Sequence, residues 1–360
     1  MSAPHPALLE VAARRPVRSV HDEQRLLDSA AEHRMVAAVL DAARVDHLPL
    51  SAHGLTTLGV WDLAEQREHL RFWSTIAEVQ ELLGPLGVDV TVLKGVATEA
   101  RWYDGPGQRV TTDVDLLLDP TALTRVGELV GRLDPDHASI RLLDDLVARR
   151  LIQHVDLRVG GTQVDLHLDP FKVGLATRSL REIWTGTETL DTAHGRIRVL
   201  AVEAELVLLL LHQNKDAFAY LGPFLDVRQI LERARLDRAR LRDLVEGEGL
   251  DVPVWKSLER VTRVLGLDVE VPSVTGPRAR AWERVWAHPL GGHEARAAAR
   301  GPQRALSLLA RGRTADSLRE LRRQVLPQRE LLELAGRLPP GGSYVGHLLG
   351  ARRRRAARHR

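Results

Sequence analysis

The stretch VLKGVATEARWYDGPGQRVTTDVDLLLD, residues 92–119, decides the fold expected for this chain. It opens with the end of a β-branched run, which predicts a short strand followed by a tight turn at the glycine. One or two turns of helix are expected over 96–103, and a glycine-containing loop over 104–108. Residues 113–118 then predict a second, apolar strand. The order strand, short helix, loop, strand indicates a small mixed α/β unit.

The rest of the chain extends this unit in both directions. LIQHVDLRV and TQVDLHL flank two glycines, a strong signal for a two-residue hairpin turn. Apolar residues at helical spacing predict helices before the first strand, over 21–44 and 62–86, and again after residue 200. The expected fold class is therefore α+β: a small mixed-sheet domain flanked by N-terminal and C-terminal helical segments.

The expected organisation has five parts. They are a loosely ordered lead-in (1–20), an N-terminal helical segment (21–87), the α/β domain (88–200), a C-terminal helical domain (201–345) and a basic tail (346–360).

Composition limits the class of protein. The 360 residues are 44% apolar and include no cysteine, which excludes a disulfide scaffold, a thiolate zinc site and a cysteine nucleophile. No apolar run approaches the roughly 20 residues that a membrane span needs. The first residues also lack an apolar stretch long enough for a signal-peptide core. We therefore expect a soluble, cytoplasmic protein without a membrane partner.

The basic charge of the chain belongs to its end. The formal net charge is +3, and the last ten residues, ARRRRAARHR, hold six arginines and no acid. Without them the net charge falls by six, from +3 to −3. A basic surface spread over the folded body is therefore not expected, and nucleic acid is not expected as a specific partner.

Asp113 and Asp115 are the first candidate metal ligands. Residues two apart on a strand point to the same face, so the two carboxylates are expected side by side. Such hard oxygen ligands on a rigid edge suit Mg²⁺, which commonly binds carboxylates together with substrate phosphates. An acid-x-acid pair is common by chance, and its position after the Lys-Gly strand end is what makes this one informative.

The hairpin supplies a third acid. A two-residue turn places Asp156 opposite Asp165 and His154 opposite His167, with all four side chains on one face. Asp165 is the preferred third ligand because its strand is the more apolar and could lie beside the Asp113 strand. Asp156 is the alternative third ligand. His167 either orients an acid or packs as a core histidine.

Phosphate contacts are expected from the basic residues around these acids. Gly95 would let the backbone approach a phosphate, and the N–H groups of the following helix favour an anion there. Lys94 offers a compact positive charge and Arg109 a forked donor. Lysine occurs only at Lys94, Lys172, Lys215 and Lys256, which draws attention to positions where arginine does not serve.

Lys215 lies on a helix that also carries His212 and Asp216. That edge either faces a cleft between the two domains or emerges into solvent. Asp226, within a later apolar helix, is expected to cap that helix or pair with an arginine.

The run LKG…A…Y…R…DVDLLL, followed by VDLHL, resembles the uncharacterised nucleotidyltransferase family of the polymerase-β-like superfamily. The similarity extends more weakly over about 30–235, through EHRMVAAVL before the motifs and LLLLHQNK and FLDVRQIL after them. One departure is that Lys94-Gly95 stands where many superfamily members carry Gly-Ser.

The resemblance implies a metal-dependent reaction. A nucleoside monophosphate would pass from an NTP, such as ATP, to a small-molecule, peptide or protein acceptor, with release of pyrophosphate. Asp113, Asp115 and Asp165 would be the catalytic acids and hold Mg²⁺, or Mn²⁺. Lys94, Gly95, Arg109 and Lys215 would contact the nucleotide, and His167 would support the acids.

Two other functions stay open. A metal-dependent phosphohydrolase could use the same carboxylates with His154 and His167 as ligands, which requires both histidines within coordination distance of Asp113. A catalytically silent binding or scaffold protein would use its helices and basic tail instead. Neither the acceptor, the preferred base nor the oligomeric state follows from the sequence.

Overall fold

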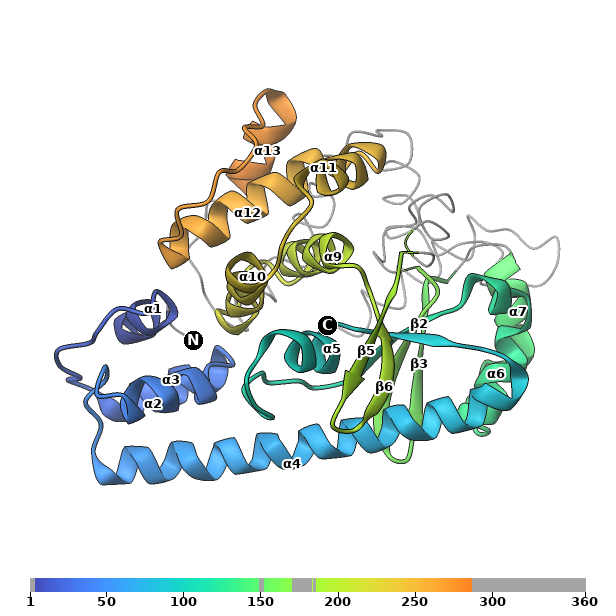
Figure 1. The fold of residues 1–360 in the computed structure, drawn as a ribbon, viewed down its shortest axis with the longest axis horizontal. Coiled ribbons are helices and arrows are strands. Elements are labelled where there is room, and N and C mark those ends of the chain that lie inside the picture. The colour runs from blue at the N-terminus through green and yellow to red at the C-terminus, as the bar shows by residue number, and fades with distance from the viewer. Residues whose placement is uncertain (1–3, 149–151, 170–182, 184–185, 287–360) are drawn as a thin grey trace, which may run out of the picture.

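A six-stranded mixed sheet forms the centre of the fold. The structure is a computed structural model that describes residues 4–148, 152–169, 183 and 186–286 (Figure 1). Helices precede the sheet in the chain, cover it and follow it, which confirms the expected α+β class. The basic tail expected over 346–360 lies outside the described residues.

The strands pair in the order β3-β4-β2-β1-β6-β5. Two hairpins form the edges of the sheet, and the central strands β1 and β2 are antiparallel to each other. Strand β2 runs parallel to β4, and β1 runs parallel to β6. The strands are β1 (Val90–Leu93), β2 (Val114–Leu118), β3 (His154–Val159), β4 (Thr162–His167), β5 (Glu188–Thr192) and β6 (Gly195–Val199).

The helices surround this sheet on several sides. In Figure 1, the long helix α4 runs beneath α2 and α3 and along the lower part of the sheet, while α9 to α13 lie above α2, α3 and α5. The helices are α1 (Pro6–Ala12), α2 (Glu23–Glu32), α3 (Val36–Arg44), α4 (Ala52–Leu83), α5 (Lys94–Trp102), α6 (Val126–Leu133), α7 (Ile140–Ala148), α9 (Val202–Lys215), α10 (Gly222–Arg233), α11 (Arg238–Gly247), α12 (Asp251–Leu265) and α13 (Pro277–Val285). None of these described helices combines the length and apolar character that crossing a membrane requires.

The N-terminal part differs from the expectation in three ways. Residues 6–12 of the supposed loose lead-in form α1, whose Leu8 is fully buried. The helix expected over 21–44 is two helices, because Arg34 between them takes a left-handed φ of 60°. Helix α4 begins ten residues before the expected residue 62, where the Ser51 side chain accepts a hydrogen bond from the Gly54 N–H (3.1 Å).

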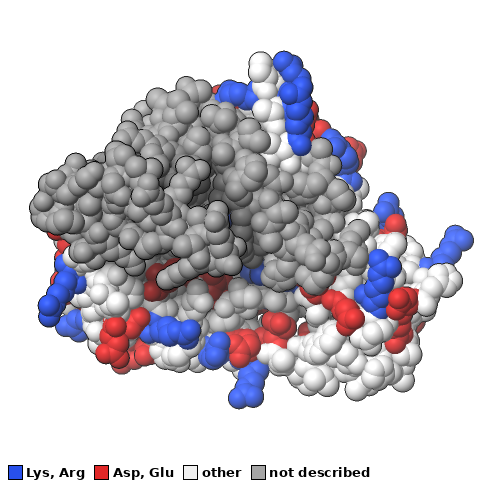
Figure 2. All heavy atoms as spheres, turned by 180° about the vertical axis from the view of Figure 1, so that it is seen from behind, with Lys and Arg blue, Asp and Glu red and all other residues white. Residues whose placement is uncertain are grey.

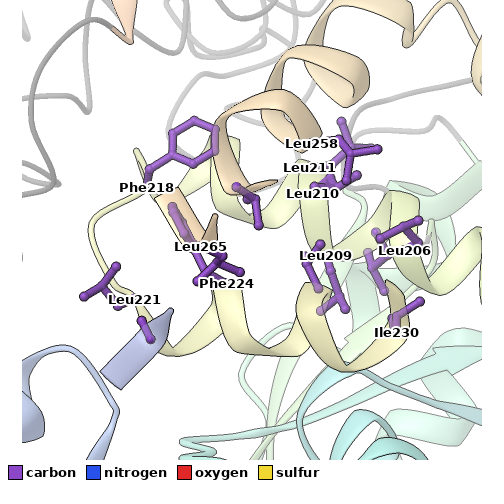
Figure 3. Packing of buried hydrophobic residues seen from close by; sticks show 14 of the residues in the cluster. Leu206, Leu209, Leu210, Leu211, Phe218, Leu221, Phe224, Ile230, Leu258 and Leu265 are labelled. Atoms are coloured by element: carbon purple, nitrogen blue, oxygen red, sulfur yellow. The ribbon is translucent and has the colours of Figure 1, made fainter. Parts of the chain in front are cut away.

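The described residues form two apolar cores, one at the sheet and one centred on helix α9. Its leucines are buried on every side, as expected for a helix that is apolar all round. Figure 3 shows Leu206, Leu209 and Leu210 of α9 close to Ile230 of α10 and Leu258 of α12. This core fixes α9, and with it His212 and Lys215 at its C-terminal end, relative to the neighbouring helices.

The hairpin β5–β6 was not predicted. Strand β5 is mostly exposed and polar, with the half-buried Leu190 as its apolar contact to the sheet core. Charged side chains protect an edge strand from pairing with other chains, and they also remove the alternating apolar pattern.

Leu116 tests the sheet core, since its side chain is completely buried at the middle of β2. Leu116→Ala is expected to lower the free energy of unfolding by about 2–5 kcal/mol, because the vacated space cannot be refilled. Urea denaturation measures the loss. The control is Leu63→Ala on α4, where the side chain is 65% exposed and a change within about 0.5 kcal/mol is expected. Equal losses in the two variants would contradict this placement of the core.

Candidate active site

Three carboxylates gather where β2 begins. The parallel pairing of β2 and β4 sets Asp115 directly beside Asp165. In the adjoining hairpin, Asp156 lies opposite Asp165 and His154 lies opposite His167. This is the register expected from the two-glycine turn. The strand order therefore brings the hairpin acid next to the Asp-x-Asp strand.

Asp115, Asp165 and His167 form a buried group with the donor atoms of a metal site. One ligand atom from each lies within 4.8 Å of the other two. Two carboxylates and an imidazole fit a divalent cation, although an imidazole suits Mn²⁺ or Zn²⁺ better than Mg²⁺. Asp113, which the sequence analysis paired with Asp115 as a metal ligand, lies half-buried near this group but is not one of its three members.

Asp115 is the most strongly held of the acids. Lys94 Nζ and His167 Nε2 each lie 2.7 Å from its Oδ1. Although burial opposes ionisation, Lys94 and His167 together hold the pKa of Asp115 well below its usual range. The Asp115 carboxylate is therefore ionised at neutral pH, and His167 fixes its orientation.

Asp113 behaves differently. Burial, together with the neighbouring carboxylates of Asp115 and Asp165, raises the pKa of Asp113, while Lys94 acts in the opposite sense. Like charges held this close together favour a cation between them.

The Lys94-Gly95 turn follows β1 directly. Both residues have positive φ, 36° and 38°. A Cβ on residue 95 would lie 2.9 Å from Thr111 Cγ2, so glycine is required for space as well as for conformation. The strained backbone at Lys94 is offset by the ion pair that its side chain makes with Asp115.

Arg109 is anchored by a helix far along the chain. Its Nε donates to Asp226 Oδ2 (2.9 Å) and its Nη1 donates to Thr111 Oγ1 (3.0 Å). The Tyr103 hydroxyl donates to the other oxygen of Asp226 (2.8 Å). The expected pairing of Asp226 with an arginine is thus confirmed, and the anchor is on α10.

A second anchor, missed by the sequence analysis, holds the loop before β2. Glu99 Oε1 accepts a hydrogen bond from the Arg109 N–H (3.0 Å), and its other oxygen contacts His69 Nδ1 on α4. His69 Nε2 in turn accepts from the Trp73 indole (2.8 Å). The long helix therefore braces the segment that carries Arg109.

Most of the predicted site residues surround a polar cleft of about 120 Å³. The predicted residues that line it are Lys94, Gly95, Arg109, Asp113, Asp115, Asp165 and Lys215. His167 is not among the lining residues and contacts Asp115 instead. Sequence reasoning missed Arg34, which reaches the cleft from the turn between α2 and α3 and carried no local chemical signal.

Described residues of both charges lie on the face shown in Figure 2. Along its lower edge, basic and acidic side chains of the described residues alternate and do not form an area of one sign.

His212 and Asp216 also line the cleft, which answers the question left open for this helix edge. His212 Nε2 lies 3.2 Å from Asp216 Oδ2. Burial, then the nearby Lys94, lower the pKa of His212 to about 4, and Asp216 only partly opposes this. His212 is therefore neutral at pH 7.

The shifted pKa of His212 predicts a pH dependence of stability. Between pH 6.5 and about 4 the unfolded chain binds a proton at His212 that the folded chain does not, so stability falls as the pH falls. The total effect is about 3 kcal/mol. In His212→Asn, urea denaturation from pH 7 to pH 4 should show that much less loss than in the unmodified protein. Parallel curves for the two proteins would contradict the prediction.

Comparison with known proteins identifies the family. A family model described as uncharacterised nucleotidyltransferase matches residues 19–266, more than half of the chain. The search of curated proteins gives no match. Among solved structures, the chain is similar to an antigenic nucleotidyltransferase-like protein from Paracoccidioides brasiliensis, with 16% identity, 55% of this chain and 94% of that chain covered, and a TM-score of 0.32. With its sequence matched from the helices before the sheet to the end of α12, the chain belongs to this family of uncharacterised nucleotidyltransferases.

Proposed function

We propose that this protein transfers a nucleoside monophosphate from an NTP to an acceptor and releases pyrophosphate. The observation that carries the proposal is the meeting of Asp113, Asp115 and Asp165 with Lys94 and Arg109 in one cleft. Acids that can hold a divalent cation and bases that can contact phosphate are the two requirements of metal-assisted phosphoryl chemistry. Membership of a nucleotidyltransferase family supports the same reaction class.

Asp115 and Asp165 would hold the cation, together with Asp113 or His167. We propose Mg²⁺, with Mn²⁺ as the alternative that the imidazole favours. When bound, such an ion neutralises triphosphate charge and orients the nucleotide. The protein's own contribution is positional: His167 fixes Asp115, and Asp226 fixes Arg109.

The transfer itself is an in-line displacement. A hydroxyl oxygen of the acceptor forms a bond to the α-phosphorus. The bond between that phosphorus and the oxygen that bridges the α- and β-phosphates breaks. Pyrophosphate leaves with the electron pair. We assign Asp165 to receive the acceptor's proton, because it lines the cleft beside Asp115. Lys94, Arg109 and Lys215 would stabilise the negative charge on the phosphates.

The phosphohydrolase alternative receives less support. It requires His154 and His167 as ligands, and His167 belongs to the buried donor group. His154 is 39% exposed at its side chain and lies 3.4 Å from Asp156. Phosphate release without an acceptor remains the measurement that would favour hydrolysis.

The acidic pair provides the first test of function. Asp113→Asn combined with Asp115→Asn should abolish the binding of Mg²⁺–nucleotide, because two of the three carboxylates at the proposed cation site lose their charge. Isothermal titration with each NTP in the presence of Mg²⁺, repeated with Mn²⁺, measures this. The matched control is Asp156→Asn on β3, whose side chain is 65% exposed. This variant should bind Mg²⁺–nucleotide as the unmodified protein does. Nucleotide binding that survives the double substitution would exclude the proposed site.

Substitution of Lys94 is expected to change metal binding and nucleotide binding in opposite directions. Lys94→Met removes the positive charge beside Asp115, so binding of Mn²⁺ alone should tighten several-fold, since one competing cation is gone. Binding of the nucleotide should weaken by about tenfold or more, because a phosphate contact is lost. Titrating Mn²⁺ by electron paramagnetic resonance, with and without nucleotide, separates the effects. Two changes in the same direction would contradict the dual role assigned to Lys94.

A further inference from the structure

A second hollow, of about 350 Å³, adjoins the active-site cleft. It lies between the end of α1, α3 and α10. Its volume falls in the range of roughly 300–1,000 Å³ that is usual for small-molecule sites, and it exceeds the 120 Å³ of the cleft. No step of the proposed reaction yet uses it.

The hollow exists because its walls are made of short apolar side chains. Helix α3 presents Ala37, Ala38 and Ala42 to it, and Val11 and Leu225 face them from α1 and α10. These walls leave room for an apolar group and offer it no hydrogen bonds. The body of a fitting ligand is therefore apolar.

Basic side chains dominate the charged part of the lining. Four arginines line the hollow: Arg14, Arg15, Arg228 and Arg233. Two carboxylates line it, Asp41 and Asp104, so the lining carries a formal net charge of +2. Glu10 and Glu232, which pair with Arg15 and Arg14, are not part of the lining. Arg233 pairs with Asp104 inside the lining. Arg14 and Arg15, whose carboxylate partners lie outside the lining, therefore present the positive charge that favours an anionic ligand.

One arginine of the lining is already held by the protein. The two Nη atoms of Arg228 donate to the carbonyl groups of Ala12 and Leu265, so its guanidinium group has a fixed position beside the hollow.

The hollow and the cleft have no lining residue in common, and a hydrogen-bonded wall separates them. Tyr103 lines the hollow and donates its hydroxyl proton to Asp226, which also accepts from Arg109 of the cleft. Beside this wall is a gap of about 10 Å³, whose lining includes Tyr103 from the hollow and Arg109 and Arg34 from the cleft. Such a gap admits roughly one water-sized group. The end group of a ligand, but not its body, fits a gap of this size.

We propose that this hollow is the acceptor site and that the acceptor is a small organic acid with an apolar body and a hydroxyl group. Its acidic group would lie at the arginines, and its hydroxyl oxygen would pass beside Tyr103 to attack the α-phosphorus, with the bond changes given above. The inference rests on the proposed nucleotidyl transfer. It narrows the acceptor to a small molecule and excludes a protein.

A pair of probes tests the site without knowledge of the natural acceptor. 1-Naphthoate has an apolar body and one carboxylate, and 1-naphthylmethanol is its neutral counterpart. By calorimetry, the unmodified protein should bind one equivalent of 1-naphthoate, and the alcohol at least tenfold more weakly. Ala42→Trp, which fills the hollow, should weaken 1-naphthoate at least tenfold. Ala52→Trp, at an exposed position at the start of α4, should not.

A second variant tests the positive charge of the hollow and does not depend on correct folding of Ala42→Trp. Arg14 is 57% exposed at its side chain, and Arg14→Gln should weaken 1-naphthoate at least threefold while leaving the alcohol unchanged. Absence of saturable 1-naphthoate binding, equal losses in the two tryptophan variants, or competition between 1-naphthoate and Mg²⁺–nucleotide would each overturn the inference.

Nucleotide titration separates this inference from the proposed function. Ala42→Trp should bind Mg²⁺–nucleotide within twofold of the unmodified protein, because Ala42 does not line the cleft. If nucleotide binds and 1-naphthoate does not, the acceptor site is wrong and the transfer reaction stands. If no Mg²⁺–nucleotide binds to the unmodified protein, the proposed function itself fails, and the acceptor role fails with it.

Discussion

The buried charge of Asp115 is the constraint on which the site depends. A carboxylate taken out of water costs several kcal/mol unless positive charge and hydrogen bonds replace its hydration. Lys94 and His167 do this from two different strand ends, each at 2.7 Å. Satisfying one charge therefore requires β1, β2 and β4 to meet in this order and register. The sheet positions the acid, and the acid in turn makes other arrangements of these strands unfavourable.

A second buried ion pair ties the sheet to the helices that follow it. Arg109 comes from the loop before β2, and Asp226 comes from α10, more than a hundred residues later. Removing one partner of such a pair would leave an uncompensated charge, so the two elements are held in one relative position. Because Arg109 also lines the cleft, the position of α10 influences the proposed phosphate site. Tyr103 extends the same contact to the adjoining hollow.

Local sequence patterns predicted the structural features that depend on residues close together in the chain. The two-glycine turn fixed the hairpin register, and the Asp-x-Asp spacing placed two acids at one strand, because both follow from the period of a β-strand. Partners distant in sequence were harder to predict. The spacing around Glu99 gives no hint of His69, and Arg34 enters the cleft only because α2 ends in a left-handed turn. The β5–β6 hairpin was missed because β5 is mostly polar and exposed, and because β6 contributes just two buried apolar residues, Ile197 and Val199.

The scarcity of lysine gains a physical meaning from the ion pairs. Lys94 is 7% exposed at its side chain and contacts an oxygen that His167 also contacts. A compact ammonium group can share that oxygen with an imidazole. A planar guanidinium group would need more space, because it presents several N–H donors in one plane. Lys256 is similarly enclosed, 12% exposed, between Glu259 and Glu283. Of the three described lysines, Lys94 and Lys256 thus lie in enclosed ion pairs, whereas Lys215 is exposed. The oxygen shared with His167 is the geometric reason to regard Lys94 as not exchangeable for arginine.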